Sequence, residues 1–250
     1  MSRNGHCATG TGTGTAVATF PMSAGTRYDW HTHVDHQLAW AASGVLVVRT
    51  EDATWVLPPT RALWIPAGLP HETGSAGRAT MRSLYISPDM SPVTWPEPTP
   101  VQASPLFAEL VSYLSGDLTD EARRHAEAVL ADLLTPAPVT TILVRSPKPG
   151  PASQVARALQ ANPSDDRTLA QWGREVGASE RTLARAFAAE TGVPFGRWRT
   201  LLRLQAALPL LAAGTPVSSA AARVGYGTSS AFVAAFRRET GRTPASYFTN

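Results

Sequence analysis

Two pairs of side chains in this sequence have types and spacing suited to chemistry. His31 and His33 are two residues apart, so on a β-strand both imidazoles point to the same side. Arg181 and Arg185 are four residues apart, so on an α-helix both guanidinium groups lie on one face. Imidazoles bind divalent transition metals, and arginine can bond guanine O6 and N7 in the major groove of DNA. The pairs therefore indicate a metal or effector site and a helix that reads DNA.

The arginine pair lies in residues 168–187, a stretch typical of two short helices joined by a tight turn. Gly177 can adopt the positive φ of such a turn, and Ser179 is a favourable N-cap for the second helix. Leu183 and Phe187 are four apart and predict the buried stripe of that helix. The arginine pair is then left on the outer face, as in a helix-turn-helix.

The same pattern recurs at residues 217–236. Gly225 supplies the turn, and Phe232 with Phe236 predicts the buried stripe. The cap of the second helix is expected at Thr228 or Ser229. The outer face carries mostly small side chains, which approach phosphates or thymine methyl groups but read few base edges.

Three segments of the C-terminal part form a signature. They are Arg203-Leu-Gln-Ala-Ala, Gly225-Tyr-Gly-Thr-Ser-Ser-Ala-Phe232 and Ala235-Phe-Arg-Arg-Glu-Thr-Gly-Arg-Thr-Pro-Ala-Ser-Tyr247. Together they closely resemble the AraC/XylS transcription regulators, over about residues 168–248. The resemblance implies a central helix, about Phe195 to Ala213, that joins the two units; Pro209 inside it is a departure that predicts a bend. The expected DNA-binding residues are Ser179, Glu180, Arg181, Thr182, Arg185, Thr228, Ser229, Ser230, Val233, Arg237 and Arg238.

A second resemblance involves the histidines. Gly25, His31, His33, Gln37 and Gly44, followed by Pro66-Ala-Gly-Leu-Pro-His71, resemble the two motifs of cupins, in which histidines and a carboxylate converge on a metal. The resemblance implies ligands at His31, His33, Gln37 and His71, with His36 as a substitute. Gln37 replaces the usual Glu with a neutral, weaker ligand, but three imidazoles still suit Zn, Ni, Co or Cu. Alternatively, the histidines line an effector pocket that holds no metal.

The order of apolar stretches indicates the elements around these sites. Short stretches separated by Gly and Pro recur over residues 20–87, as in a small β-barrel or sandwich. They are Gln37–Ala42, Val45–Arg49, Thr54–Leu57 and Met81–Ile86. Residues 87–105 hold six prolines, too many for a helix or central strand. Two helices with apolar stripes follow, at Leu106-Leu110-Leu114 and Ala126-Val129-Leu130-Leu133-Leu134, and short helices fill the chain after Ser153.

The expected fold is α+β and multidomain: a cupin-like β-barrel followed by helices, then an all-α domain with two helix-turn-helix units. We expect a disordered leader at residues 1–15 and a sensor barrel at 16–90. A helical dimerisation segment at 105–135 and a linker at 136–152 follow, and the DNA-binding domain takes 153–250.

Charge and composition agree with this division. The net charge of +3 separates into +8 from Arg145 onward and −5 before it, so the C-terminal part is the one suited to a polyanion. The chain is 43% hydrophobic but has no run long enough for a bilayer, and its Gly/Thr-rich start lacks the apolar core of a signal peptide. Cys7 is the only cysteine, which excludes an intramolecular disulfide and suits a reducing cytoplasm.

The favoured hypothesis is a cytoplasmic regulator, not an enzyme. It binds double-stranded promoter DNA, responds to a small molecule or metal in its cupin domain, forms a homodimer and works with RNA polymerase. An alternative is a cupin metalloenzyme, a dioxygenase or isomerase, with a helical appendage; the missing carboxylate at Gln37 disfavours it. A third hypothesis is a DNA-binding protein whose barrel serves only dimerisation.

Overall fold

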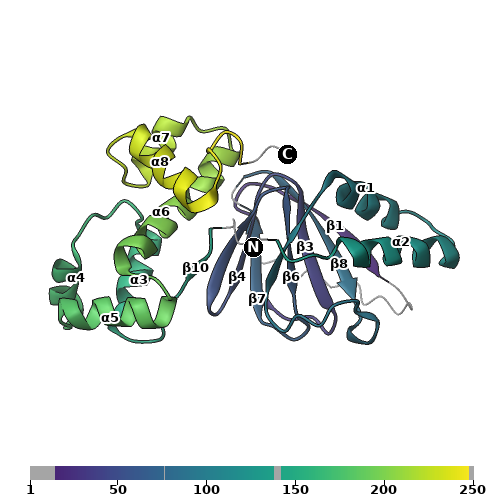
Figure 1. The fold of residues 1–250 in the computed structure, drawn as a ribbon, viewed down its shortest axis with the longest axis horizontal. Helices are drawn as coiled ribbons and strands as arrows, with labels where there is room; N and C mark the ends of the chain where they lie inside the picture. Colours follow the sequence, from purple (N-terminus) through teal and green to yellow (C-terminus); the bar gives the residue numbers. More distant parts are fainter. Residues whose placement is uncertain (1–14, 76, 138–141, 248–250) are drawn as a thin grey trace. The chain divides into compact units, whose positions relative to one another are not determined.

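The computed structural model describes residues 15–75, 77–137 and 142–247 (Figure 1). The chain forms two compact units, one of Met1–Thr50, Leu57–Val139 and Tyr247–Asn250, the other of Glu51–Val56 and Thr140–Ser246. The predicted leader, including Cys7, lies outside the described residues except for Thr15. Thr15 is buried, and its backbone N–H donates to Glu127 Oε1 at 2.6 Å. Within the described segments, no helix is long and apolar enough to cross a membrane.

Two five-stranded sheets form the β part of the fold. The first has the order β1-β8-β3-β6-β9, and the second has the order β10-β5-β4-β7-β2. The strands of the first are β1 (Ala16–Met22), β8 (Ala79–Ile86), β3 (His36–Ser43), β6 (Arg61–Ile65) and β9 (Thr99–Gln102). Those of the second are β10 (Val144–Arg145), β5 (Ala53–Leu57), β4 (Leu46–Thr50), β7 (His71–Ser75) and β2 (Arg27–His31). The predicted apolar stretches fall in strands except for Val45, which precedes β4, and this confirms the expected β architecture.

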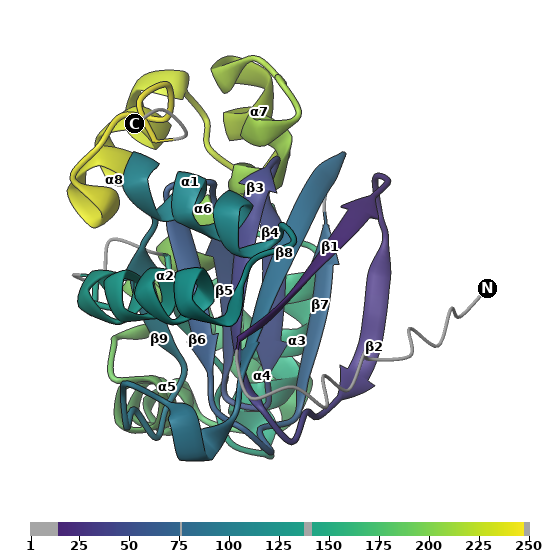
Figure 2. The same ribbon diagram turned by 90° about the vertical axis from the view of Figure 1, so that its right-hand side faces the viewer.

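Two helices cover one face of the first sheet, α1 (Pro105–Leu114) and α2 (Asp120–Leu133), as Figure 2 shows. Ser104 caps α1 by accepting from the N–H of Phe107, and Thr119 caps α2 in the same way. Leu38 and Trp40 on β3 pack into a core that includes Phe107. Because side chains alternate along a strand, the neighbours Gln37 and Ala39 face the opposite side of the sheet.

The buried stripes of these helices agree with the predicted ones only in part. On α1, Leu106 is 57% exposed, and the core contacts come from Phe107, Val111 and Leu114. This second series also has helical spacing, and its phenylalanine fills the space beside Trp40. On α2, Val129 is 41% exposed, whereas Ala126, Leu130 and Leu134 are buried. Helical spacing alone does not distinguish two overlapping apolar stripes.

The sheets also extend beyond the predicted barrel, residues 16–90. The Pro-rich segment contains a short 3-10 helix, η1 (Pro88–Met90), and then β9, which pairs with β6 and forms an isolated bridge from Val101 to Pro136. Pro100 fits there because β9 is an edge strand. The predicted linker, residues 136–152, is likewise not structureless, because it contains β10, which pairs antiparallel with β5.

The second unit is helical from α3 (Pro151–Ala161) onward. It continues with α4 (Leu169–Val176), α5 (Glu180–Thr191), α6 (Phe195–Ala212), α7 (Val217–Arg223) and α8 (Ser229–Thr240). The predicted central helix is α6, which runs through Pro209. The α4–α5 and α7–α8 pairs are the two expected helix-turn-helix units. Both end alike: Thr191 and Thr240 each donate a hydroxyl hydrogen bond to the carbonyl four residues earlier, on a buried phenylalanine.

Candidate DNA interface and histidine cluster

The second helix of the first unit, α5, presents the arginine pair to solvent. Ser179 is its N-cap, and the hydroxyl accepts from the N–H of Thr182 at 3.1 Å. Leu183 and Phe187 are fully buried, so the opposite face is left outside. The predicted contact residues Ser179, Glu180, Arg181, Thr182 and Arg185 are all exposed. Among the described ion pairs none involves Arg181 or Arg185, so both guanidinium groups are available to a ligand.

The turn before α5 depends on two glycines, only one of which sequence reasoning identified. Gly177 has the expected left-handed conformation, with φ of 68°. Gly173 is buried inside α4, and a Cβ atom there would lie 2.5 Å from the carbonyl oxygen of Ala178. The sequence signal was a glycine in the middle of a short helix, where alanine is intrinsically preferred.

The second helix of the second unit, α8, presents a different surface. Thr228 is its N-cap and accepts from the N–H of Ala231, which decides between the two expected caps. Phe232 and Phe236 are fully buried. The outer face is an open hollow lined by Ser229, Ser230, Val233, Ala234, Arg237 and Arg238. Small side chains near the N-terminus and arginines near the C-terminus therefore share one face.

The two arginines of α8 are not equivalent. Arg238 donates from Nε to Glu239 Oε1 at 3.2 Å, and the carboxylate of Glu239 also pairs with Arg197 at 3.1 Å. Arg237 takes part in none of the ion pairs formed by the described residues. Arg237 is thus the freer cation of the two for binding a phosphate.

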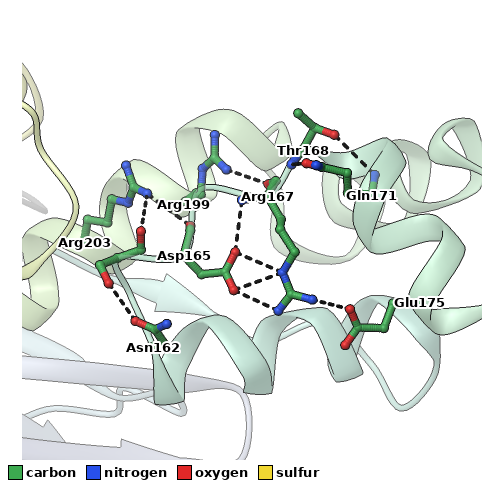
Figure 3. Close-up of polar contacts among 9 residues, drawn as sticks. Asn162, Asp165, Arg167, Thr168, Gln171, Glu175, Arg199 and Arg203 are labelled. Carbon is green, nitrogen blue, oxygen red and sulfur yellow. Dashed lines mark hydrogen bonds and ion pairs between the residues drawn. The ribbon is translucent and has the colours of Figure 1, made fainter.

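A network of hydrogen-bonded arginines links the loop before α4 to the central helix α6, and this network was not predicted from the sequence. Figure 3 shows Arg167, which bonds both carboxylate oxygens of Asp165 and pairs with Glu175. These carboxylates raise the pKa of Arg167, whereas the hydrogen bonds from Arg167 lower the pKa of Asp165. Arg203 of α6 donates to backbone carbonyls on the same loop. Burial, followed by the charge of Arg199, lowers the pKa of Arg203.

In the first unit, three predicted ligands come together. His31, His33 and His71 each offer a ring nitrogen, and these atoms lie within 4.8 Å of one another. His31 and His71 are register partners of β2 and β7, with ring centroids 4.4 Å apart. His33 lies 4.8 Å from His31 and 5.3 Å from His71 by the same measure. Strand pairing therefore unites residues that lie about forty positions apart.

Hydrogen bonds define which nitrogens of two rings can bind a ligand. His31 Nδ1 lies 2.6 Å from the carbonyl oxygen of Asp29, and His71 Nδ1 lies 2.9 Å from that of Leu69. A carbonyl only accepts, so each Nδ1 carries the hydrogen, and each Nε2 keeps its lone pair. His71 Nε2 is buried and has no hydrogen-bond partner within the described part of the chain. Histidine metal ligands are commonly oriented in this way.

Burial favours the neutral form of His33 and His71. Desolvation lowers the pKa of His71 to about 4; its bond to Leu69 opposes this, and the neighbouring histidines add to the lowering. Desolvation is also the main cause of the lowered pKa of His33, with a further contribution from His31. Neutral imidazole is the form that binds a metal.

Gln37 and His36 face different sides of β3. Gln37 is 2% exposed; its Nε2 donates to Ser83 Oγ at 2.8 Å, and its Oε1 has no partner among the described residues. Its register partner is Tyr85, whose ring lies 5.0 Å from that of His33, so Gln37 lies on the side of the cluster. His36 instead packs on Trp64 and accepts from the N–H of Ala67. His36 is therefore not the predicted substitute ligand.

Comparisons with known proteins agree with both halves of this arrangement. A model of a helix-turn-helix domain matches residues 172–250, and a model of the AraC-like ligand binding domain matches residues 16–135. The chain is 32% identical over 222 residues to the HTH-type transcriptional regulator NimR of Escherichia coli strain K12, spanning 87% of this chain and 81% of that protein. It is 40% identical over 103 residues to the HTH-type transcriptional regulator RipA of Corynebacterium glutamicum, 41% of this chain and 31% of that protein.

Solved structures similar to this one include ToxT from Vibrio cholerae. The identity is 11%, with 94% of this chain and 98% of that chain covered and a TM-score of 0.41. A DNA-binding transcriptional dual regulator from Escherichia coli K-12 is 27% identical, covers 40% of this chain and 91% of its own, and has a TM-score of 0.37.

Proposed function

The chain belongs to the AraC family of DNA-binding transcriptional regulators with a ligand-binding domain, and from this premise we propose that α5 and α8 divide the work on DNA. In this proposal α5 discriminates the base sequence, and α8 mainly anchors the protein to phosphates. The observation that carries it is the contrast between the two outer faces, long unpaired arginines on α5 and small side chains on α8.

The length and exposure of the two arginine side chains on α5 support the proposal that this helix reads bases. Arg181 and Arg185 are exposed, four residues apart and outside the described ion pairs, so binding DNA breaks no existing contact of theirs. A guanidinium group presents a planar fork that matches the O6 and N7 atoms of guanine. Each such contact contributes about 1–3 kcal/mol of discrimination against the wrong base.

The composition of α8 supports anchoring instead. Ser229 and Ser230 lie in its first turn, where backbone N–H groups have no helical partner and favour an anion. Arg237 in the last turn supplies a long cation on the same outer face. Contacts of this kind position a protein on a duplex without reading its sequence.

The test is a selection of binding sites from random double-stranded DNA with the full chain. Arg185→Ala is expected to lose one or two base preferences of the wild-type motif and about 1–3 kcal/mol of specific binding. Arg157→Ala on α3 is the matched control, because it removes an exposed arginine outside both recognition helices. An unaltered motif with Arg185→Ala, together with a degraded one with Ser230→Ala, would reverse the proposed division.

For the effector, we propose that the histidine cluster binds a divalent metal, Zn, Ni, Co or Cu. Support comes from the three converging rings, the hydrogen-bonded Nδ1 atoms of His31 and His71, and the unpartnered Oε1 of Gln37. Three imidazoles suit these metals, and a bound metal would supply a charged centre for an effector. Binding of a small molecule to the same residues without metal is the other form of this proposal, and metal titration distinguishes the two.

The same cluster argues for a sensor rather than an enzyme. It contains three histidines and no carboxylate among the described residues, and Gln37 is a neutral neighbour. The relatives that match are transcriptional regulators. Oxygen consumption or isomerisation by the metal-loaded full chain, abolished by His71→Ala, would overturn this proposal in favour of the cupin metalloenzyme.

The outer faces of α1 and α2 support a homodimer. Leu106 and Tyr113 are seven residues apart on one face of α1 and are 57% and 51% exposed, and Val129 of α2 is 41% exposed. We propose that a second copy covers these side chains and that the dimer acts on RNA polymerase in the cytoplasm. Light scattering should report a dimer for the wild type and a monomer for Leu106→Asp with Tyr113→Asp. A monomeric wild type at micromolar concentration would contradict the dimer.

A further inference from the structure

Arg203 uses its whole guanidinium group to bond backbone carbonyls of two separate segments. Its Nε donates to Pro163 at 2.9 Å, and its Nη2 donates to Ser164 at 3.4 Å and Asp165 at 3.1 Å. Its Nη1 donates to Gly225 at 3.0 Å. Arg203 belongs to the central helix α6, so three parts of the chain meet at this one side chain.

The first of these segments leads directly into the first helix-turn-helix. Figure 3 shows the loop before α4, where Arg167 donates a hydrogen bond to Asp165 and forms an ion pair with Glu175. Arg167 also stacks on Trp172 of α4, with its guanidinium carbon 3.5 Å from the ring centroid. Arg199 of α6 donates to the carbonyl of Arg167 at 2.9 Å. The loop therefore transmits the position of α6 to α4, and through the tight turn to α5.

The second segment is the turn of the second helix-turn-helix. Gly225 has φ of 88°, and a Cβ atom on it would lie 2.8 Å from Ser164 Cα and 2.9 Å from Arg203 Nη2. The turn between α7 and α8 is thus packed directly against the loop that precedes α4. A glycine is required there by both its conformation and its surroundings.

We propose that Arg203 is a positioning residue that fixes the orientation of the recognition helices α5 and α8 relative to each other. The inference rests on the proposed function, in which both helices contact one duplex. Two linked binding modules gain affinity only when their geometry allows both to bind at once. A planar fork with five N–H groups can hold carbonyls of two segments together, whereas lysine offers a single point of attachment.

The experiment uses the full chain and DNA selected by the wild type. Affinity is measured for the intact site, for a duplex with the α8 half scrambled, and for duplexes with one base pair added or removed between the halves. We expect the wild type to lose about tenfold or more on each altered duplex. Arg203→Met should bind the intact site about tenfold more weakly, bind the scrambled duplex within about twofold of wild type, and lose its spacing preference.

Three further variants separate positioning from folding and charge. Gly225→Ala disturbs the same junction from the other side and should lose the spacing preference as well. Arg157→Met removes an exposed positive charge from α3 without touching either segment that Arg203 holds, and should keep the preference. Arg203→Lys keeps the charge and should recover part of the spacing preference.

Three results would overturn the inference. If Arg203→Met keeps the wild-type spacing preference, this inference fails while the division between α5 and α8 stands. If Arg203→Met loses affinity equally for intact and scrambled duplexes, Arg203 acts on folding or on DNA itself rather than on geometry. If the wild type is indifferent to the α8 half, the proposed division fails, and the inference fails with it.

Discussion

His31 and His71 are register partners in the antiparallel β2–β7 pair, and their ring centroids lie 4.4 Å apart. Each ring is held through Nδ1 by a carbonyl two residues away in its own segment. The pairing of the strands and these local bonds define the positions of both Nε2 atoms before any ligand arrives. Such preorganisation reduces the entropy that binding would otherwise cost.

We expect the full chain to bind one Co²⁺ or Zn²⁺ ion, with His71→Ala weakening the affinity by at least about tenfold. The reason is that His71 is the most buried residue of the cluster. Visible absorption of bound Co²⁺ provides the readout, and His125→Ala, an exposed residue of α2, serves as the control. Equal Co²⁺ spectra and affinities for His71→Ala and wild type would rule out this metal site.

The metal-free protein should lose stability as the pH falls from about 6.5 to about 4. The folded-state pKa of His71 is lowered to about 4 from the ordinary histidine value of 6.5, so in this window the unfolded chain binds more protons than the folded one. The shift corresponds to a loss of about 3 kcal/mol by pH 4. Denaturant unfolding in the presence of a chelator should show a shallower pH dependence for His71→Gln. Parallel curves for the two proteins would mean that His71 is not the titrating group.

The candidate sites could be predicted from sequence where the determining interactions are local. Ser179, Gly177 and the arginine pair of α5 act within one turn of a helix, so their spacing was sufficient. His36 was assigned wrongly because β2 ends at His31 and residues 32–35 lie outside any strand, so strand alternation relates neither His33 nor His36 to His31. Arg203 was missed because its acceptors are backbone carbonyls 22 to 40 residues away, which leave no side-chain pattern.

The fold shows the same limit. The strands around Leu38 and Leu84 follow from short apolar stretches between turn residues, and they are where the sequence predicts them. The edge strand β9 was not predicted because it contains Pro100. Proline is excluded from a central strand but is tolerated in an edge strand. The side of α1 that packs inward depends on the fit of Phe107 against Trp40, which periodicity does not contain.

Arg237→Ala should weaken binding to specific and random DNA alike and lower the slope of log affinity against log salt by about one. The residue is exposed and is predicted to contact phosphate, so its removal eliminates one counterion-releasing contact. Arg238→Ala should change the slope less, because Glu239 already pairs with Arg238. Titrations at several salt concentrations provide the measurement. A change in the selected base motif with Arg237→Ala would instead identify it as a base-reading residue.

Gly173→Ala and Gly196→Ala should change stability in opposite directions, although both place a methyl group on a helix. The Cβ atom at Gly173 would lie 2.5 Å from the Ala178 carbonyl oxygen, a backbone atom that moves only if the α4–α5 turn opens, and we expect a loss of about 1–3 kcal/mol. At Gly196, an exposed position on α6, no atom lies within 4 Å of the added group. There the better helix propensity of alanine should add up to about 1 kcal/mol. Urea unfolding of the full chain, followed by helical circular dichroism, compares the two variants. Equal midpoints for Gly173→Ala and wild type would show that the turn tolerates a side chain and that the close approach does not hold α5 in place.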